Sequence, residues 1–258
     1  MPHQRTTGLT ATQFATLLKA LTHHLTWVKP DQKPHKLTLT QALKITLISY
    51  RHHLTQEALA HLFEVSQPAV SRTISTIEKA LEKVLTPLAQ PLQESLKAPG
   101  ALVVDGSLST HLELALTRGG NFTLGSISVP GITTRCSALL KGKLLAITDP
   151  LPGARHDAHA FRAHGLDRLL DSSTLADKGY VGLGLATPTK RKPGQRLSAE
   201  VKKNNRIINR LRSVVEPVIA QLKVWRVLHA GFRRALGSYG RVFSVVGGLV
   251  FLAVGGTL

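Results

Sequence analysis

The stretch STLADKGY, residues 173–180, decides the fold that this chain is expected to adopt. Residues that favour strands lead into Asp177, and Gly179 follows two positions later. A carboxylate at the end of a buried strand is unfavourable unless a cation or several hydrogen-bond donors meet it. We therefore expect Asp177 to end a core strand and to face a cation. The alternative is an aspartate that only forms a turn before a glycine.

Two further acids occupy comparable settings. Asp105 follows the apolar run ALVV, residues 101–104, and precedes a glycine. Glu216 lies in a helical segment rich in basic residues, with Arg212 four residues before it and Lys223 seven residues after it. On one continuous helix these three side chains would share a face. Glu216 is therefore either a partner in a surface ion pair or a metal-binding acid between two phosphate-binding cations.

Four motifs carry a resemblance to a known family: VVDGS (residues 103–107), GARHD (153–157), LADKGY (175–180) and RLRSVVEPVIAQLKVWR (210–226). They are similar to the motifs of the DDE transposases of bacterial insertion sequences, in the branch related to the Harbinger elements. The similarity extends over most of the chain between the second expected helix and the last of these motifs.

The resemblance implies an enzyme that cleaves DNA phosphodiester bonds at the ends of its element and transfers the strands into target DNA. It implies that Asp105, Asp177 and Glu216 are catalytic and hold two Mg²⁺ (or Mn²⁺) ions, which prefer hard oxygen ligands. Asp157 is a candidate fourth metal ligand, with capping of a helix as the alternative role. It also implies a homo-oligomer assembled on DNA.

Two domains are expected, because prolines accumulate between residues 85 and 100. Residues 1–90 have the helical periodicity of an all-α DNA-binding domain, and residues 100–258 have the pattern of an α/β domain with a mixed sheet and flanking helices. The resemblance gives the second domain its ribonuclease-H-like fold. The elements expected there are a strand at 101–105, hairpins at 111–129 and 132–149, a helix at 158–170, a strand ending at Asp177, a strand at 183–186 and a long helix after Ser198.

Residues 54–84 have the pattern of a helix-turn-helix. Thr55 and Ser66 are the expected N-caps of its two helices, and Pro68 is tolerated in the first turn of the second. A plain helical hairpin in a bundle would explain the same pattern. The side chains expected to contact DNA are Ser66, Gln67, Ser71, Arg72 and Thr73 in this segment, and Arg212 and Lys223 beside Glu216.

The charge of the chain supports a nucleic-acid partner. Lys and Arg number 33 against 15 Asp and Glu, a net charge of +18, which suits a polyanion. The single cysteine, Cys136, excludes an intrachain disulfide and fits a reducing bacterial cytoplasm, with the protein on the nucleoid when it is bound to DNA. The apolar segment 242–258 is expected to be a buried closing helix, because it is shorter than the roughly 20 residues that cross a bilayer.

One departure from the family pattern keeps two other functions open. Family members often carry a basic, histidine-containing stretch before the second strand, whereas residues 123–130 have no charge. A DNA-binding regulator or domesticated protein that keeps the fold without cutting DNA is one alternative. A metal-dependent nuclease without strand transfer is the other.

Overall fold

The structure is a computed structural model, and it describes residues 4–28, 35–88, 102–109, 112–113, 128–129, 132–139, 144–148 and 157–255. The chain packs into two compact units. Residues 1–89 and 222–258 form one of them, here called the helical unit, and residues 90–221 form the other, here called the sheet unit. Each unit is described by itself.

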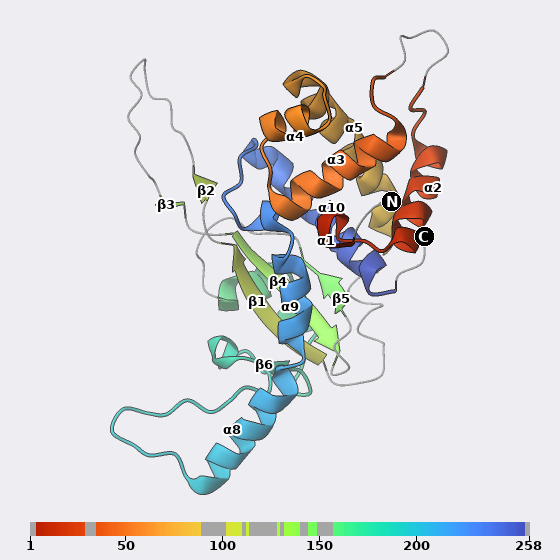
Figure 1. Cartoon of the computed structure of the whole chain (residues 1–258). Coiled ribbons are helices and arrows are strands. Elements are labelled where there is room, and N and C mark those ends of the chain that lie inside the picture. Colours follow the sequence, from red (N-terminus) through yellow and green to blue (C-terminus); the bar gives the residue numbers. More distant parts are fainter. Residues whose placement is uncertain are drawn as a thin grey trace. The chain divides into compact units, whose positions relative to one another are not determined.

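The helical unit is built from amphipathic helices whose starts are set by side-chain caps. Thr10 and Thr38 each form a reciprocal capping box with a glutamine three residues later, which satisfies two backbone N–H groups at each helix start. The helical character expected of residues 1–90 is confirmed for the described part of that segment. The elements are α1 (Gln4–Thr7), α2 (Ala11–His24), α3 (Leu39–His52), α4 (Gln56–Leu62), α5 (Gln67–Leu85), η1 (Thr86–Leu88), η4 (Arg226–Leu228), η5 (Leu236–Ser238) and α10 (Tyr239–Ala253) (Figure 1).

The C-terminal segment belongs to the helical unit, which differs from the expected single domain over residues 100–258. Helix α10 packs against α5 so closely that a Cβ on Gly248 would lie 2.5 Å from the Cβ of Leu85. Gln13 donates hydrogen bonds to the carbonyls of Leu252 and Ala253 at the end of α10. The apolar residues of α10 are therefore core residues, as expected. Among the helices that the structure describes, none is long and apolar enough to span a membrane.

The sheet unit contains a four-stranded mixed sheet with the strand order β5-β4-β1-β6. β1 (Leu102–Ser109) pairs antiparallel with β4 (Ile132–Leu139), which pairs antiparallel with β5 (Leu144–Ile147). On the other side of β1, β6 (Leu175–Ala176) runs parallel to it. A second ladder joins β2 (Leu112–Glu113) to β3 (Ser128–Val129). The two expected hairpins thus have paired strands, while their turns lie outside the described residues.

The remaining elements of the sheet unit follow the sheet in the chain. The expected helix 158–170 is shorter than expected, because Gly165 adopts a left-handed conformation, with φ of 65°. The expected strand 183–186 is wrong, since only Ala186 forms a single bridge to Leu175. The elements are α7 (Asp157–Ala163), η2 (Leu166–Arg168), η3 (Lys178–Tyr180), α8 (Ala199–Arg212) and α9 (Val215–Lys223), the last of which continues into the helical unit.

Candidate active site and nucleic-acid interface

Asp105 and Asp177 occupy equivalent positions on neighbouring parallel strands. Val104 of β1 pairs with Ala176 of β6, and each aspartate follows its strand's member of this pair by one residue. Because the two strands run parallel in this register, the two aspartate backbones lie side by side. Strand β1 is longer than the expected strand 101–105, since it continues past Asp105 to Ser109. The register therefore brings together two acids that are 72 positions apart in the sequence.

The residues that precede the two aspartates belong to one apolar core. Val104, Ala176, Phe161 and Tyr180 are fully buried in one apolar cluster. The rings of Phe161, on α7, and Tyr180, in η3, meet edge to face with centroids 5.8 Å apart. Val104 and Ala176 immediately precede the two aspartates in the sequence. Packing of these two residues in the core therefore fixes the backbone positions of Asp105 and Asp177.

Asp177 has a capping role of its own. Its Oδ1 accepts a hydrogen bond of 2.6 Å from the backbone N–H of Gly179, which starts the 3₁₀ turn η3. The turn-forming alternative is thus present in the structure. The bond engages Oδ1 and holds the half-buried side chain in one orientation, and Oδ2 remains as a second acceptor. Capping and metal binding are compatible in this geometry.

Asp157 is the first residue of α7. This position at the start of a helix is compatible with the alternative role of a helix cap. Its side chain, like that of Asp105, is outside the described part of the structure. Phe161, four residues later on α7, belongs to the cluster beneath Asp105 and Asp177. The start of α7 is therefore tied to the same core as the two strands.

Glu216 lies in the first turn of α9, exposed to solvent. The long helix expected after Ser198 is interrupted: α8 ends at Arg212 and α9 begins at Val215. Pro217 explains the break, because it has no N–H to offer the carbonyl of Ser213, and the N–H of Glu216 donates to that carbonyl instead, at 3.2 Å. The prediction that Arg212, Glu216 and Lys223 share one continuous helical face is therefore wrong.

The four candidate ligands thus come from β1, the end of β6, α7 and α9. Among the side chains that the structure describes, no three His, Cys, Asp or Glu residues gather as a metal site. The side chains of Asp105 and Asp157 lie outside this part of the structure. The arrangement that the structure does define is the adjacency of Asp105 and Asp177 on neighbouring strands of the sheet.

Helices α4 and α5 form the expected helix-turn-helix. Thr55 caps α4 through a 3.2 Å bond from the N–H of Ala58, whereas Ser66, at the N-cap of α5, makes no side-chain capping bond. Glu64 in the turn adopts a left-handed conformation, with φ of 53°. At the start of α5, Ser66, Gln67 and Arg72 are exposed and Ser71 is half-buried.

Thr73 corrects one of the expected DNA contacts. Its side chain is buried on the same side of α5 as Ile74 and Ile77, so it packs against the other helices of the unit and not toward solvent. Leu62 is the opposite case. Its spacing along α4 is that of a core residue, yet 64% of its surface is exposed to solvent. The remaining candidates, Ser66, Gln67, Ser71 and Arg72, keep some solvent exposure.

A buried ionic network holds α5 in place. Glu78 is 1% exposed, accepts a 2.7 Å hydrogen bond from the hydroxyl of Tyr50 on α3, and forms a two-pronged ion pair with Arg234. Burial, followed by the charge of Glu78, raises the pKa of Tyr50 well above its usual value. Burial alone would lower the pKa of Arg234, but its bond to Glu78 and the charge of that carboxylate raise it overall. Sequence reasoning missed this network, because Arg234 is 156 residues from its partner.

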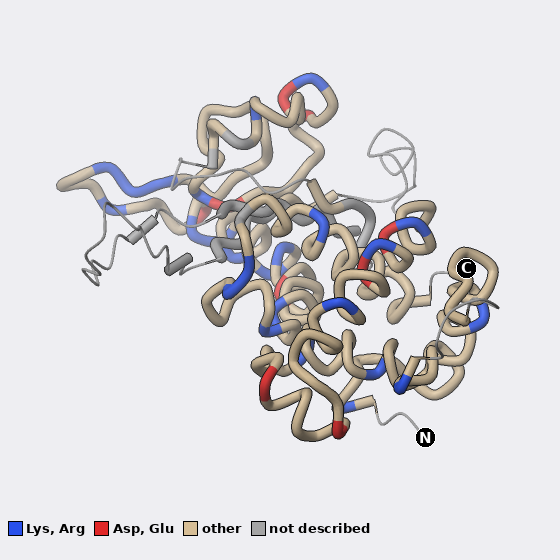
Figure 2. The backbone as a smooth tube through the Cα atoms, turned by 90° about the horizontal axis from the view of Figure 1, so that it is seen from above, with Lys and Arg blue, Asp and Glu red and all other residues tan. Residues whose placement is uncertain are grey.

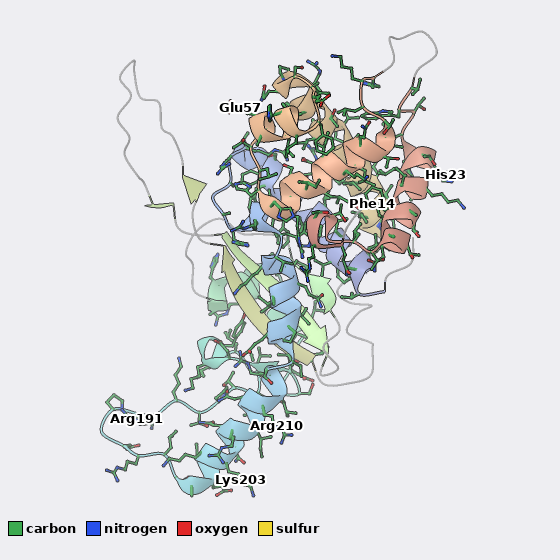
Figure 3. All side chains as sticks on the ribbon, viewed as in Figure 1. Phe14, His23, Glu57, Arg191, Lys203 and Arg210 are labelled. Atoms are coloured by element: carbon green, nitrogen blue, oxygen red, sulfur yellow. The ribbon has the colours of Figure 1, made fainter. Side chains whose placement is uncertain are left out.

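Residues 187–212 form a second basic surface, here called the basic arm. It contains nine Lys and Arg residues and one acid, Glu200. Asn205 on α8 fixes the preceding loop by accepting a 2.8 Å bond from the N–H of Thr189 and donating a 3.0 Å bond to its carbonyl. Figure 2 marks the basic residues of the chain in blue, and Figure 3 shows Arg191 on the loop and Lys203 and Arg210 along α8. No residue of α8 is buried.

Comparison with known proteins identifies the class to which this fold and site belong. The family model of the DDE superfamily endonuclease matches residues 132–250, and that of the helix-turn-helix of DDE superfamily endonuclease matches residues 35–87. The chain belongs to the DDE superfamily endonucleases and carries their helix-turn-helix domain. The segment 132–250 includes Asp157, Asp177 and Glu216, while Asp105 lies between the two matched segments, outside both.

The chain is similar to transposases of two insertion sequences. It is 28% identical over 226 residues to a transposase assigned to insertion sequence element IS112 of Streptomyces albus G, covering 86% of this chain and 83% of the relative. It is 27% identical over 228 residues to a transposase assigned to insertion sequence element IS702 of Microchaete diplosiphon, covering 86% and 82%. No solved structure matches the chain.

Proposed function

We propose that this protein is the DNA transposase of a bacterial insertion sequence, which cleaves DNA at the ends of its element and joins those ends to target DNA. Membership of the DDE superfamily endonucleases and similarity to two insertion-sequence transposases support this function. The structural observation that carries it is the adjacency of Asp105 and Asp177 beyond the parallel pairing of β1 and β6. Such a protein acts in the bacterial cytoplasm, on the nucleoid when bound to DNA.

Asp105, Asp177 and Glu216 are the catalytic carboxylates of this proposal, and they hold two Mg²⁺ or Mn²⁺ ions. DDE superfamily endonucleases generally use divalent metal ions. Carboxylates suit such ions, which prefer hard oxygen ligands and keep several waters. Asp105 would serve both ions, and Asp177 and Glu216 would hold one each. Asp157 is the fourth ligand, directly or through a water.

The bound ions supply two things that phosphodiester cleavage needs, a deprotonated oxygen nucleophile and neutralisation of the charge on the leaving oxygen. The protein's own residues position the DNA. Arg212 and Lys223, at the ends of α8 and α9, contact phosphates on either side of Glu216. The bond from Gly179 holds the carboxylate of Asp177 in one orientation, which limits the reorganisation needed when the substrate binds.

The sheet unit is proposed to have the ribonuclease-H-like fold. Three antiparallel strands (β1, β4 and β5) are followed by a strand, β6, that runs parallel to the first. The acids follow that order, with one on the first strand, one after the parallel strand and one on a later helix. In domain terms we propose that residues 100–221 carry catalysis, and that residues 222–258, included in that domain from the sequence, complete the DNA-binding domain of residues 1–90.

DNA is the partner of both units in this proposal. Helix α5 reads the element ends through Ser66, Gln67, Ser71 and Arg72, and Arg72 is long enough to pair with a guanine or a phosphate. The basic arm adds sequence-independent affinity for phosphates. A homo-oligomer forms when two element ends are brought together, because strand transfer joins both ends to one target.

Cleavage of a labelled duplex taken from the ends of the element tests the proposed function. Incubation with Mg²⁺ should produce nicks at the element boundary and joined products with a target plasmid, and chelation of the metal should abolish both. Metal-dependent nicks without joined products would assign the chain to plain nucleases. Specific binding without any nick would assign it to DNA-binding regulators.

A further inference from the structure

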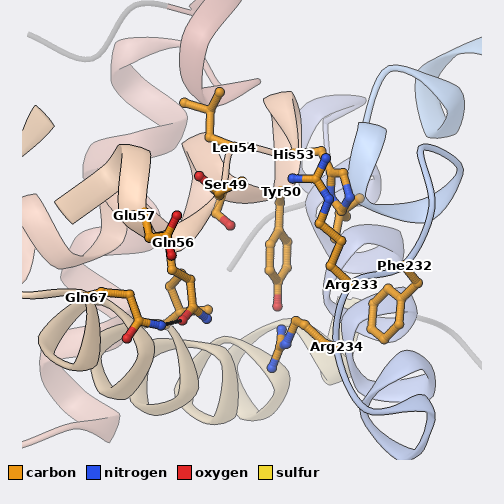
Figure 4. A pocket seen from close by; sticks show the side chains of 13 residues that line it. Ser49, Tyr50, His53, Leu54, Gln56, Glu57, Gln67, Phe232, Arg233 and Arg234 are labelled. Carbon is orange, nitrogen blue, oxygen red and sulfur yellow. Dashed lines mark hydrogen bonds between the residues drawn. The ribbon is translucent and has the colours of Figure 1, made fainter. Parts of the chain in front are cut away.

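A cleft of about 310 Å³ lies beside the helix-turn-helix, within the helical unit. Its walls come from α3, α4 and α5 and from the segment 227–234, which follows the last catalytic motif in the sequence. Gln67, the first residue of α5, lines the cleft and donates a 2.6 Å hydrogen bond to Gln56 of α4. Arg233 and His53 line it from the opposite side (Figure 4). The start of α5, Arg233 and His53 therefore line the same cleft.

Four cationic or ionisable side chains gather at this segment: His53, Arg226, His229 and Arg233, here called the cationic cluster. The ring of His53 is fixed by a 2.7 Å hydrogen bond to the carbonyl of Gly231, and the ring of His229 contacts the carbonyl of Lys223. Burial lowers the pKa of His53, and the charges of Arg233, His229 and Arg226 lower it further, whereas the bond to Gly231 opposes the shift. Each of the other three groups is thus close enough to His53 to act on its charge.

The two arginines of the cluster face solvent without an acid to neutralise them. Arg226 and Arg233 are exposed, and neither takes part in an ion pair among the residues that the structure describes. The neighbouring Arg234 behaves differently, because it turns inward to the buried Glu78. Glu57 is the only exposed acid among the described residues that line the cleft. The fold therefore holds these positive charges in one cluster, where like charges repel one another. An anionic ligand would reduce that repulsion.

We propose that the cationic cluster binds the phosphate backbone of the duplex whose bases α5 reads, so that residues that follow Glu216 in the sequence complete the DNA-binding surface. The inference rests on the proposed function, in that it needs the helix-turn-helix to bind DNA. Phosphate contacts beside a recognition helix fix the register and orientation of that helix in the groove. Arg226 and Arg233 have the exposure to make such contacts, and His53 and His229 are half-buried.

The double variant Arg226→Ala/Arg233→Ala of the full chain tests the cluster. Fluorescence anisotropy measures its binding to two duplexes, one from the DNA that flanks the gene and one of scrambled sequence, over a series of salt concentrations. Loss of two phosphate contacts should make the slope of log K against log salt shallower by about two units on both duplexes. The matched control is Lys19→Ala/Lys36→Ala, which removes the same charge at two exposed sites of the helical unit away from the cleft.

A second variant separates charge from folding. Arg226→Lys/Arg233→Lys keeps both charges, so it should restore most of the slope that the alanine variant loses. If Arg226→Ala/Arg233→Ala has the same salt slope as the control Lys19→Ala/Lys36→Ala, the cationic cluster does not contact phosphate and the inference is overturned. Weaker binding to the flanking duplex alone would also overturn it, since that result indicates base reading. A parent chain that binds neither duplex would contradict the proposed function itself.

Discussion

Helices α5 and α8 are both basic at one end and both belong to DNA-binding surfaces in our account, yet they are stabilised in opposite ways. Nine residues of α5 are buried, and its position is fixed by the core, by Tyr50 and by ion pairs to the C-terminal segment. No residue of α8 is buried, and its described hydrogen bonds include the Ser198 cap and the Asn205 contacts with Thr189. Helix α5 is thus tied into a core, whereas α8 presents its basic residues without one.

The two glutamates of α5 that pair with arginines give the sharpest test of its rigidity. Glu78 is buried and Glu82 is 38% exposed. Glu78→Gln should lower the free energy of unfolding of the helical unit by about 3 kcal/mol, because it leaves the charge of Arg234 uncompensated. Glu82→Gln, which breaks the pair with Arg241, should change it by about 0–1 kcal/mol.

Tryptophan fluorescence during urea unfolding measures both variants, because the only two tryptophans of the chain, Trp27 and Trp225, lie in the helical unit. The signal therefore reports on that unit alone. Equal effects of the two substitutions would show that burial of Glu78 contributes nothing special to the position of α5.

Tyr50→Phe probes the neutral member of the same network. Removing the hydrogen bond to the Glu78 carboxylate should lower the free energy of unfolding by about 1.5–3 kcal/mol at neutral pH. The raised pKa of Tyr50 in the folded state means that its stabilising contribution is present below the unfolded pKa of about 10 and is lost as pH rises above it. The difference between parent and variant should therefore shrink above pH 10, and a difference that stays constant with pH would contradict the assigned cause.

Neutralising the basic arm should leave stability almost unchanged. Lys203, Arg206 and Arg210 recur at intervals of three and four residues on one side of α8. Replacing all three by Gln should change the free energy of unfolding of the sheet unit, followed by circular dichroism, by less than about 0.5 kcal/mol, since no buried group is affected. The salt slope of binding to random duplex should become shallower by about two to three units. An unchanged slope would remove the arm from the DNA-binding surface.

The sequence predicted the helical unit well wherever local chemistry decides the structure. The cap Thr55 was expected and is confirmed, whereas the capping boxes of Thr10 and Thr38 were not anticipated, although they too are local features of the sequence. The association of residues 222–258 with that unit was not predictable, because it depends on contacts such as Glu78 with Arg234 and Gly248 with Leu85. Periodicity carries no information on which distant segment covers a given helix face.

The candidate site was predicted in part, and mostly through the family resemblance. The apolar runs before Asp105 and Asp177 indicated two strands, and the parallel pairing of β1 with β6 brings the two acids together, although only β6 ends at its aspartate. The break before Glu216 follows from Pro217, which leaves the carbonyl of Ser213 without its usual donor. The burial of Thr73 was missed because residues at the edge of an amphipathic face are ambiguous in periodicity alone.

The central claim, that Asp177 acts through metal, is tested most directly by comparing Asp177→Asn with Asp171→Asn. Both aspartates cap a following turn through Oδ1, with bonds of 2.6 Å to the N–H of Gly179 and 2.9 Å to the N–H of Ser173. Asparagine retains a side-chain acceptor for each cap and removes one charge in each case. We predict that Asp177→Asn abolishes cleavage of an element-end duplex in Mg²⁺ while DNA binding persists, and that Asp171→Asn cleaves like the parent. Undiminished cleavage by Asp177→Asn would contradict the account.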